Sequence, residues 1–201
     1  LKEVFTIKID NIKNYISETN QDSFMRLADE IYELTIHLNG TYPGYKEWFY
    51  DKQIKGCLTP NRNIIFIKNE EEKIIALSCL KKDEEEKKIC TFFVSDEYRK
   101  QGLGSLLFEE SMKFLETTKP LVTFTEDKLP MFEKIVTKYN WELTEIVDGI
   151  YNDGIREFCF NGQLTNRNYR EELIEILRKI RNKAKTELQD NDTIEKITIR
   201  R

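Results

Sequence analysis

The stretch that decides the fold lies at residues 98–107 and reads Tyr98-Arg99-Lys100-Gln101-Gly102-Leu103-Gly104-Ser105-Leu106-Leu107. Its two glycines, one residue apart, allow a tight turn and leave no Cβ between the backbone and a ligand. A β-rich run at 89–94 precedes this stretch, and an amphipathic helical pattern follows it. The backbone amides of 101–105 therefore fall at the first turn of a helix, where N–H groups lack intrahelical acceptors and the helix dipole is positive. We expect this loop to bind the phosphates of a cofactor.

Residue spacing excludes two common phosphate-binding motifs. Leu107 occupies the place of the third glycine in a dinucleotide fingerprint. No Gly-Lys-Ser or Gly-Lys-Thr follows at the spacing of a Walker A loop. A plain tight turn from strand to helix remains open as the alternative to a phosphate site.

Hydrophobic periodicity on either side of the loop predicts a mixed α/β chain. Alternating apolar residues indicate strands, and apolar residues every three or four positions indicate helices. In chain order these are a strand at 4–9, helices at 23–38 and 46–54, strands at 63–68, 73–80 and 89–94, a helix to 116, a strand at 121–125, a helix at 130–139, and strands at 141–147 and 156–160. We expect one central, mostly antiparallel sheet with helices on both faces.

A domain boundary is expected near residue 162, where the pattern of the α/β domain (1–162) ends. The segment 163–201 carries ten Lys and Arg and seven Asp and Glu, a net +3, whereas the whole chain is −4. It reads as an amphipathic helix at 169–189 and a strand-like tail at 193–199. Because the charges are mixed along the helix, a packing appendage that could form a homodimer is favoured over a nucleic-acid arm.

Composition and charge argue against nucleic-acid binding, membrane insertion, secretion and metal binding. The net charge of −4 argues against nucleic acid as a partner. No run of 18 apolar residues or charged-then-apolar leader is present, so neither a membrane span nor a signal peptide is expected. The four cysteines are far apart and there is one histidine, so no metal site is expected. Cysteines in apolar strand-like runs indicate reduced core residues and a cytoplasmic protein.

Arg99-x-x-Gly102-x-Gly104 resembles the Arg/Gln-x-x-Gly-x-Gly/Ala motif of the GNAT superfamily of acyl-CoA N-acyltransferases. The preceding strand, the following helix and the order of the elements are similar to that family as well. Residues 138–142, Lys-Tyr-Asn-Trp-Glu, stand where family members often read Tyr-x-x-x-Gly-Phe. The resemblance covers roughly residues 2–162 and implies a GNAT-like fold for them.

The resemblance also implies acetyl-CoA as the donor. The amides of 101–105 would bind its pyrophosphate, and the backbone at the end of strand 89–94 would pair with the pantetheine arm. This strand and the one at 121–125 splay apart in the family, which lets the thioester reach the acceptor. The implied cofactor-binding residues are Phe93, Val94, Arg99, Lys100, Gln101, Gly102, Leu103, Gly104 and Ser105.

The residues that transfer protons in the family are harder to match. Many members carry a carboxylate in the strand before the glycine loop, but 89–94 contains none. Glu126 is the first candidate for base or amine binder, with a solvated turn as the other interpretation. The family's usual general acid is a tyrosine on the last helix. Its place here holds Phe132 or Val136, neither of which can donate a proton. Tyr139 is the nearest tyrosine, and it could equally pack or cap the end of its helix.

The segment between the first two helices often lines the acceptor side in the family. Tyr42, Tyr45 and Trp48 are therefore candidate acceptor-binding residues, with core packing as an equal alternative for Trp48. The sequence thus predicts an N-acetyltransferase that acts on a primary amine of a small molecule or peptide. The alternative is a regulatory module that binds acyl-CoA with weak or no catalysis.

Overall fold

The computed structural model describes residues 6–17 and 21–164. The predicted helix at 169–189 and the strand-like tail at 193–199 lie outside these residues, as does the start of the predicted strand at 4–9. Within the described ranges, none of the helices combines the length and the apolar character that crossing a bilayer requires.

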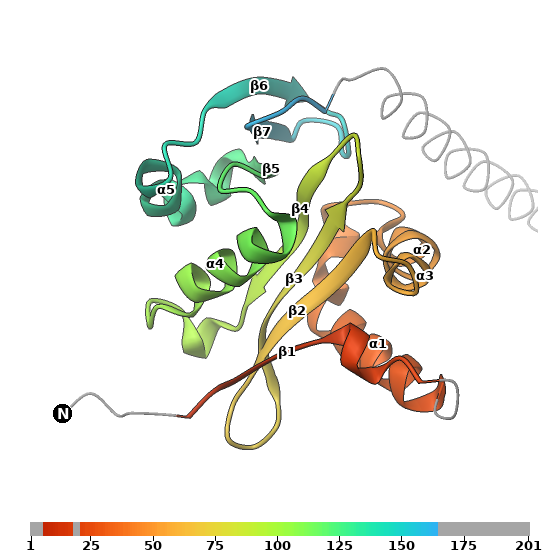
Figure 1. Ribbon diagram of the computed structural model, residues 1–201. Coiled ribbons are helices and arrows are strands. Elements are labelled where there is room, and N and C mark those ends of the chain that lie inside the picture. The colour runs from red at the N-terminus through yellow and green to blue at the C-terminus, as the bar shows by residue number, and fades with distance from the viewer. Residues whose placement is uncertain (1–5, 18–20, 165–201) are drawn as a thin grey trace, which may run out of the picture.

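One sheet of seven strands forms the centre of the molecule (Figure 1). The strands lie in the order β1-β2-β3-β4-β5-β7-β6, and every neighbouring pair is antiparallel except β4 and β5. Their bounds are β1 Lys8–Asn11, β2 Arg62–Lys68, β3 Ile74–Lys82, β4 Lys87–Val94, β5 Leu121–Thr125, β6 Leu143–Asp148 and β7 Arg156–Phe160. The predicted mixed, mostly antiparallel sheet is confirmed.

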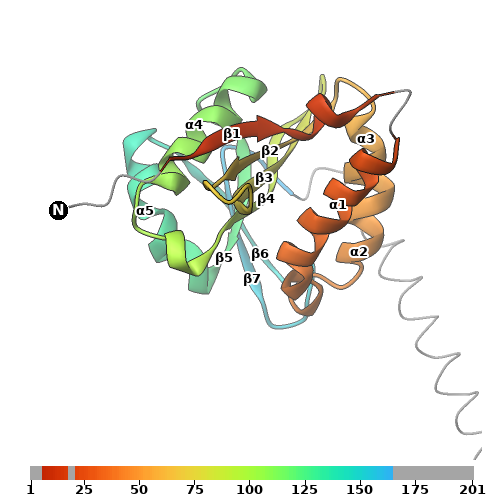
Figure 2. The same cartoon turned by 90° about the horizontal axis from the view of Figure 1, so that it is seen from below.

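Helices cover both faces of the sheet, with α4 and α5 on one face and α1, α2 and α3 on the other (Figures 1 and 2). The α-helices are α1 Gln21–Thr35, α2 Tyr45–Trp48, α3 Lys55–Cys57, α4 Leu103–Leu115 and α5 Leu129–Lys138. The other helical segments are the 3-10 turns η1 Ile12–Tyr15, η2 Ile36–Gly40, η4 Asp96–Tyr98 and η5 Glu126–Lys128, and the π-helical segment η3 Phe49–Ile54.

Two predicted helices differ from the observed ones in their bounds. The helix predicted at 23–38 leaves the α conformation at Thr35, whose φ is −110° and ψ 7°. The Thr35 hydroxyl hydrogen-bonds the carbonyls of Ile31 and Tyr32 at 3.0 and 3.2 Å, a local contact that competes with helix continuation. The helix predicted at 46–54 instead runs on through η3 into α3.

Each face of the sheet has its own hydrophobic core. On the α4 and α5 face, Phe92 of β4 stacks on Phe108 of α4 at 4.0 Å, and Phe124 of β5 stacks on Phe132 of α5 at 3.9 Å. On the opposite face, α1, α2 and η3 pack on alternate residues of β2 and β3. Because side chains alternate along a strand, the neighbours of Phe124 and Phe158 in sequence point to the α1–α3 face.

Strands β4 and β5 pair over a short distance and then separate. Their register holds only Lys88 opposite Leu121 and Ile89 opposite Val122. Beyond this point β4 stays paired with β3, and β5 stays paired with β7. A bulge in the β3–β4 ladder leaves Cys90 without a register partner just where the separation begins. We call the opening between residues 91–94 of β4 and 123–125 of β5 the fork.

Candidate functional site

The glycine loop connects the end of β4 to the start of α4. The Ser95 amide still donates to the carbonyl of Ile75 at 2.9 Å, so the ladder with β3 extends one residue past the strand. The chain then turns through η4 and adopts positive φ at Lys100 (62°) and Gly102 (91°). Gly102 is the N-cap of α4, and its left-handed conformation is one that glycine adopts without steric cost. The predicted β-loop-α unit is therefore present.

The first turn of α4 presents free backbone donors. Its first hydrogen bond runs from the Leu106 amide to the Gly102 carbonyl at 3.1 Å, which leaves the amides of 103–105 without an intrahelical acceptor. No side chain caps this end, and no acidic residue lies in the first turn. A Cβ built on Gly102 or Gly104 would meet no atom within 4 Å, so both backbones face open space. This geometry suits an anion such as a pyrophosphate.

Side chains of the predicted cofactor loop mostly hold the loop itself. Arg99 donates from Nε to the Val94 carbonyl at 3.1 Å and pairs with Asp96 at 2.7 Å. Gln101 donates to the Glu97 carbonyl at 2.9 Å. Leu103 is buried in the core, while the side chains of Lys100 and Ser105 are exposed. The donors of this site are therefore the backbone amides and, at its edge, Lys100.

Phe93 and Val94 lie on the β4 side of the fork. Both belong to the ladder with β3, where Phe93 is opposite Leu77 and Val94 is opposite Ala76. On their other edge the described part of the chain provides no strand partner, because pairing with β5 ends at Ile89. An extended ligand could add to this edge through backbone hydrogen bonds.

Glu126 follows β5 directly and is held by an arginine. Arg156 of β7 donates to both of its carboxylate oxygens, at 2.7 Å to Oε1 and 2.6 Å to Oε2. The pair is exposed to solvent, with the Glu126 side chain 56% accessible. The next residue, Asp127, pairs with Lys128, and this contact lowers the pKa of Asp127. Glu126 therefore has its charge compensated before any amine arrives.

Phe132 of α5 lies at the fork, whereas Tyr139, just after α5, lies away from it. Phe132 stacks on Phe124 and meets Phe92 edge to face at 6.0 Å, so it contacts both strands at the fork. Tyr139 lies beyond the C-terminus of the helix, and its hydroxyl donates to Glu109 of α4 at 3.3 Å. The neighbouring Trp141 donates to the carbonyl of Thr118, ahead of β5. Tyr139 thus lies near the start of β5, where the two strands are still paired.

The three predicted acceptor residues have distinct environments. Tyr45 is only 5% exposed and donates to the Thr35 hydroxyl at 3.0 Å, inside the α1–α3 core. Trp48 stacks on Tyr45 and has the guanidinium of Arg62 6.0 Å from its ring centroid. Tyr42 is half-buried and points toward the sheet, where its hydroxyl donates to Glu157 Oε1 at 3.1 Å. Of the three, Tyr42 makes a direct contact with a carboxylate.

Glu157 of β7 was not among the residues predicted from sequence. It is 1% exposed, and burial raises the pKa of its carboxyl. The hydroxyls of Tyr42 and Thr123 and the charge of Lys88 lower that pKa and only partly offset the effect of burial. The available signal was a glutamate in the apolar alternation of Arg156–Phe160, at the same face as Cys159.

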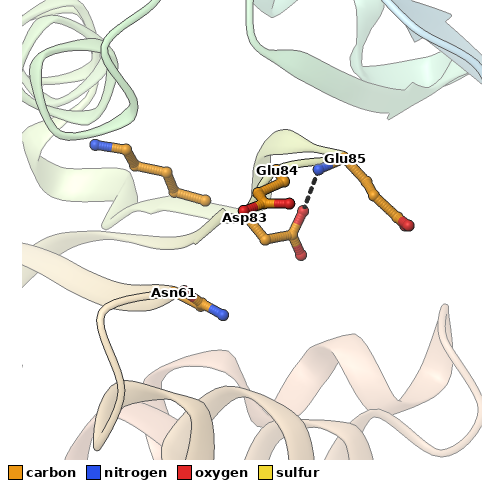
Figure 3. Close-up of a pocket in the computed structure, with 5 residues that line it drawn as sticks. Asn61, Asp83, Glu84 and Glu85 are labelled. Atoms are coloured by element: carbon orange, nitrogen blue, oxygen red, sulfur yellow. Dashed lines mark hydrogen bonds between the residues drawn. The ribbon is translucent and has the colours of Figure 1, made fainter.

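One hollow of the surface lies at the turn between β3 and β4. It is shown in Figure 3, has a volume of about 610 Å³ and is lined by Asn61, Lys82, Asp83, Glu84 and Glu85. The Glu85 amide donates to Asp83 there at 3.1 Å, as the dashed line marks. This turn lies at the end of β4 opposite to the glycine loop, so it adds nothing to the fork. Within residues 6–17 and 21–164, no group of three or more His, Cys, Asp or Glu is placed to hold a metal ion.

Comparisons with known proteins agree with this geometry. The model of the acetyltransferase (GNAT) family matches residues 23–127, just over half of the chain. That range contains β2 to β5, the glycine loop and α4. Among curated proteins, none matches the chain in sequence.

Two solved structures of low identity share the fold, and a third matches in part. An acetyltransferase of the GNAT family from Desulfovibrio desulfuricans superimposes with a TM-score of 0.56 at 11% identity, over 77% of this chain and 97% of that one. The ribosomal-protein-S18-alanine N-acetyltransferase from Escherichia coli gives 0.52 at 12% identity, over 77% and 92%. Nourseothricin acetyltransferase gives 0.46 at 13% identity, and the match spans 50% of this chain and 64% of that enzyme.

Proposed function

The chain belongs to the acetyltransferase (GNAT) family, and on this premise we propose that it transfers the acetyl group of acetyl-CoA to a primary amine. One observation carries the proposal. The uncapped first turn of α4 follows β4 through η4 and the glycine loop, at the end where β4 loses its pairing with β5. An anion site and a free strand edge are thus adjacent, which suits a ligand with a pyrophosphate and an amide-containing arm.

The residues that would hold acetyl-CoA follow from this placement. The amides of 101–105 would bind the pyrophosphate, with the ammonium of Lys100 beside it. Arg99 would act through the loop, because its own donors are used on Val94 and Asp96. The open space at Gly104 leaves room for the phosphates close to the backbone. Phe93 and Val94 would pair their backbone with the pantetheine amides.

Acetyl-CoA supplies an activated acyl group as a thioester. The chain's own contribution begins with holding the thioester and the amine together at the fork, since proximity alone supplies much of the acceleration. The aromatic rings of Phe92, Phe124 and Phe132 pack together on the α4 and α5 face of the fork. The four cysteines are free, which fits the proposal of a cytoplasmic enzyme.

A regulatory module that binds acyl-CoA without efficient catalysis is the second candidate. Two observations favour it: Arg156 compensates the charge of Glu126, and Phe132 brings no proton donor to the fork. The two candidates share the cofactor site and differ only in turnover.

Calorimetric titration with acetyl-CoA, followed by a thiol-release assay with a panel of primary amines, tests both candidates. The enzyme should bind acetyl-CoA and release thiol with at least one amine. Binding without thiol release on any amine favours the regulatory module, and absence of binding overturns both.

The variant Gly104→Glu locates the cofactor site. It places a carboxylate in the open space at the first turn of α4, so acetyl-CoA binding should be lost while the circular dichroism spectrum is retained. The control Gln163→Glu adds the same charge at an exposed position outside the loop and should bind normally. Equal affinity in the two variants would refute this placement.

A further inference from the structure

A buried carboxylate lies on the face of the sheet opposite to α4. Phe158 and Phe160 of β7 pack into the core under α4 and α5, so Glu157 and Cys159 point to the α1–α3 face. Glu157 lies opposite Thr125 in the β5–β7 ladder, next to the fork. The glycine loop and Glu157 therefore approach the fork from opposite faces.

The hydrogen bonding of this carboxylate is incomplete. Oε1 accepts a hydrogen bond from the Tyr42 hydroxyl at 3.1 Å, and the nearby Thr123 hydroxyl also favours the ionised carboxylate. Oε2 is fully buried and has no hydrogen-bond partner among the described residues. An ionised carboxylate offers about four acceptor sites, and leaving a buried polar group unsatisfied costs on the order of 1–3 kcal/mol. A buried polar group in this condition is explained when a ligand completes its hydrogen bonds.

Two tyrosines lie beside the carboxylate. Tyr42 comes from the segment after η2, and Tyr151 from the loop between β6 and β7, and the rings meet edge to face at 5.1 Å. Burial raises the pKa of Tyr151, and Glu157 and Cys90 nearby raise it further. Cys90 lies at the point where β4 departs from β5, so Tyr151 is near both Glu157 and the start of the fork. A carboxylate with aromatic side chains beside it is suited to an ammonium group.

We propose that Glu157 binds the ammonium group of the acceptor and accepts its proton, and that Tyr42 and Tyr151 enclose the first carbons of the amine. The acceptor class is a primary alkyl ammonium ion. This inference rests on the proposed acetyl transfer and deepens it by assigning the acceptor site. Glu157 is 1% exposed, so the amine reaches it only after a local movement, and Gly149 and Gly154, both with positive φ, lie on either side of Tyr151 in the β6–β7 loop.

The step balances in atoms and charge. A proton passes from the ammonium nitrogen to Oε2, which leaves a neutral amine and a carboxylic acid. The amine nitrogen then forms a bond to the acetyl carbon as the carbon–sulfur bond breaks, and the bonding electrons leave with sulfur. The second proton of the nitrogen ends on the thiolate, directly or through water. The titratable and charged groups facing Glu157 are Tyr42, Tyr151, Lys88, Cys159 and Asp127.

Carboxyl-carbon NMR of the full chain, labelled at glutamate, tests the site without a known acceptor. Glu157 is assigned by the signal lost in Glu157→Gln and titrated with n-butylammonium chloride or with n-butanol, each in the presence of CoA. The ammonium ion should move the titration of Glu157 to lower pH, because a bound cation stabilises the carboxylate, and n-butanol should not.

Two results would overturn the inference. One is a Glu157 titration that n-butylammonium leaves unchanged up to 100 mM, and the other is an equal shift with n-butanol. CoA binding is measured in the same sample through its own signals. A failure to bind CoA would therefore count against the proposed function and be distinguished from a failure at Glu157.

Discussion

The hydroxyl of Tyr42 and the Oε1 atom of Glu157 are joined by a hydrogen bond of 3.1 Å between residues 115 positions apart in the chain. The contact connects the segment after η2 with β7, on the face of the sheet opposite to the glycine loop. It supplies the carboxylate with a neutral donor but leaves its other oxygen without a partner. The bond therefore orients Glu157 without neutralising it.

Removing this donor should change the pH dependence of the reaction. The Tyr42 hydrogen bond lowers the pKa of Glu157 against the larger, opposite effect of burial. In Tyr42→Phe that pKa should rise, so a base needed in its ionised form becomes active at a higher pH. The acid limb of the kcat/KM profile should shift upward in pH. Tyr50→Phe, which removes a hydroxyl bonded to Asp29 on the surface, serves as the control and should not shift it. A limb that moves downward would contradict the assignment.

Glu157→Gln should abolish most of the turnover and spare cofactor binding. The amide keeps the shape of the side chain and can accept from Tyr42, but it cannot take a proton from an ammonium ion. Loss of a general base lowers kcat by about 10²–10⁴-fold. Thiol release measures the rate, and calorimetry should give an unchanged Kd for acetyl-CoA. The control Glu142→Gln removes an exposed carboxylate paired with Lys119 and should retain full turnover. Similar rates in both variants would remove Glu157 from the mechanism.

The same Glu157→Gln substitution should stabilise the protein at neutral pH. The carboxyl pKa is raised in the folded state, so its contribution to stability is present below the unfolded pKa of about 4.3 and is lost as pH rises through the folded pKa. Glutamine does not titrate, so the Tm of the variant should exceed that of the wild type increasingly from pH 4 to pH 8. Each unit of raised pKa is worth about 1.4 kcal/mol, or roughly 3–5 °C in Tm.

Calorimetric scans from pH 4 to pH 8 check whether the Tm difference between Glu157→Gln and the wild type grows with pH. Glu142 provides the opposite case, because Lys119 lowers the pKa of its carboxyl. Glu142→Gln should therefore gain no Tm between pH 4 and pH 8. A Glu157→Gln variant that is less stable at pH 8 than at pH 4, relative to wild type, would contradict a buried carboxylate with a raised pKa.

The glycine loop could be predicted from sequence because its chemistry is local. Gly102 needs a positive φ that few other residues adopt, and the helix that starts at Leu103 follows from apolar spacing. The mostly antiparallel character of the sheet was also predicted, from short alternating runs, but the order of its strands was not. These features depend on neighbours within a few residues of each other.

Glu157 could not be predicted because its burial depends on topology. Strand β7 is the last of the described strands in sequence but lies between β5 and β6, so both of its edges are paired, and Glu157 is buried there. Placed at the edge, the same glutamate would be solvated. Glu126 was the more visible candidate in sequence, yet Arg156, thirty positions away, engages both of its oxygens. The roles of Glu126, Tyr139, Tyr45 and Trp48 stay predictions.

Arg99 links the glycine loop to β4, and its removal should weaken cofactor binding without contact to the cofactor. Its Nε holds the Val94 carbonyl and its NH2 group holds Asp96, so Arg99→Ala frees the loop at two points. Loss of one or two hydrogen bonds to a charged donor is worth about 1–2 kcal/mol, so the Kd for acetyl-CoA should rise about 5–30-fold. Arg99→Lys should not restore it, because one ammonium cannot reproduce two directed contacts. Calorimetry measures both variants against Lys113→Ala, which removes an exposed ion pair near the other end of α4. An unchanged Kd in Arg99→Ala would show that the loop holds its shape without this tether, and that the backbone of 101–105 alone sets the affinity.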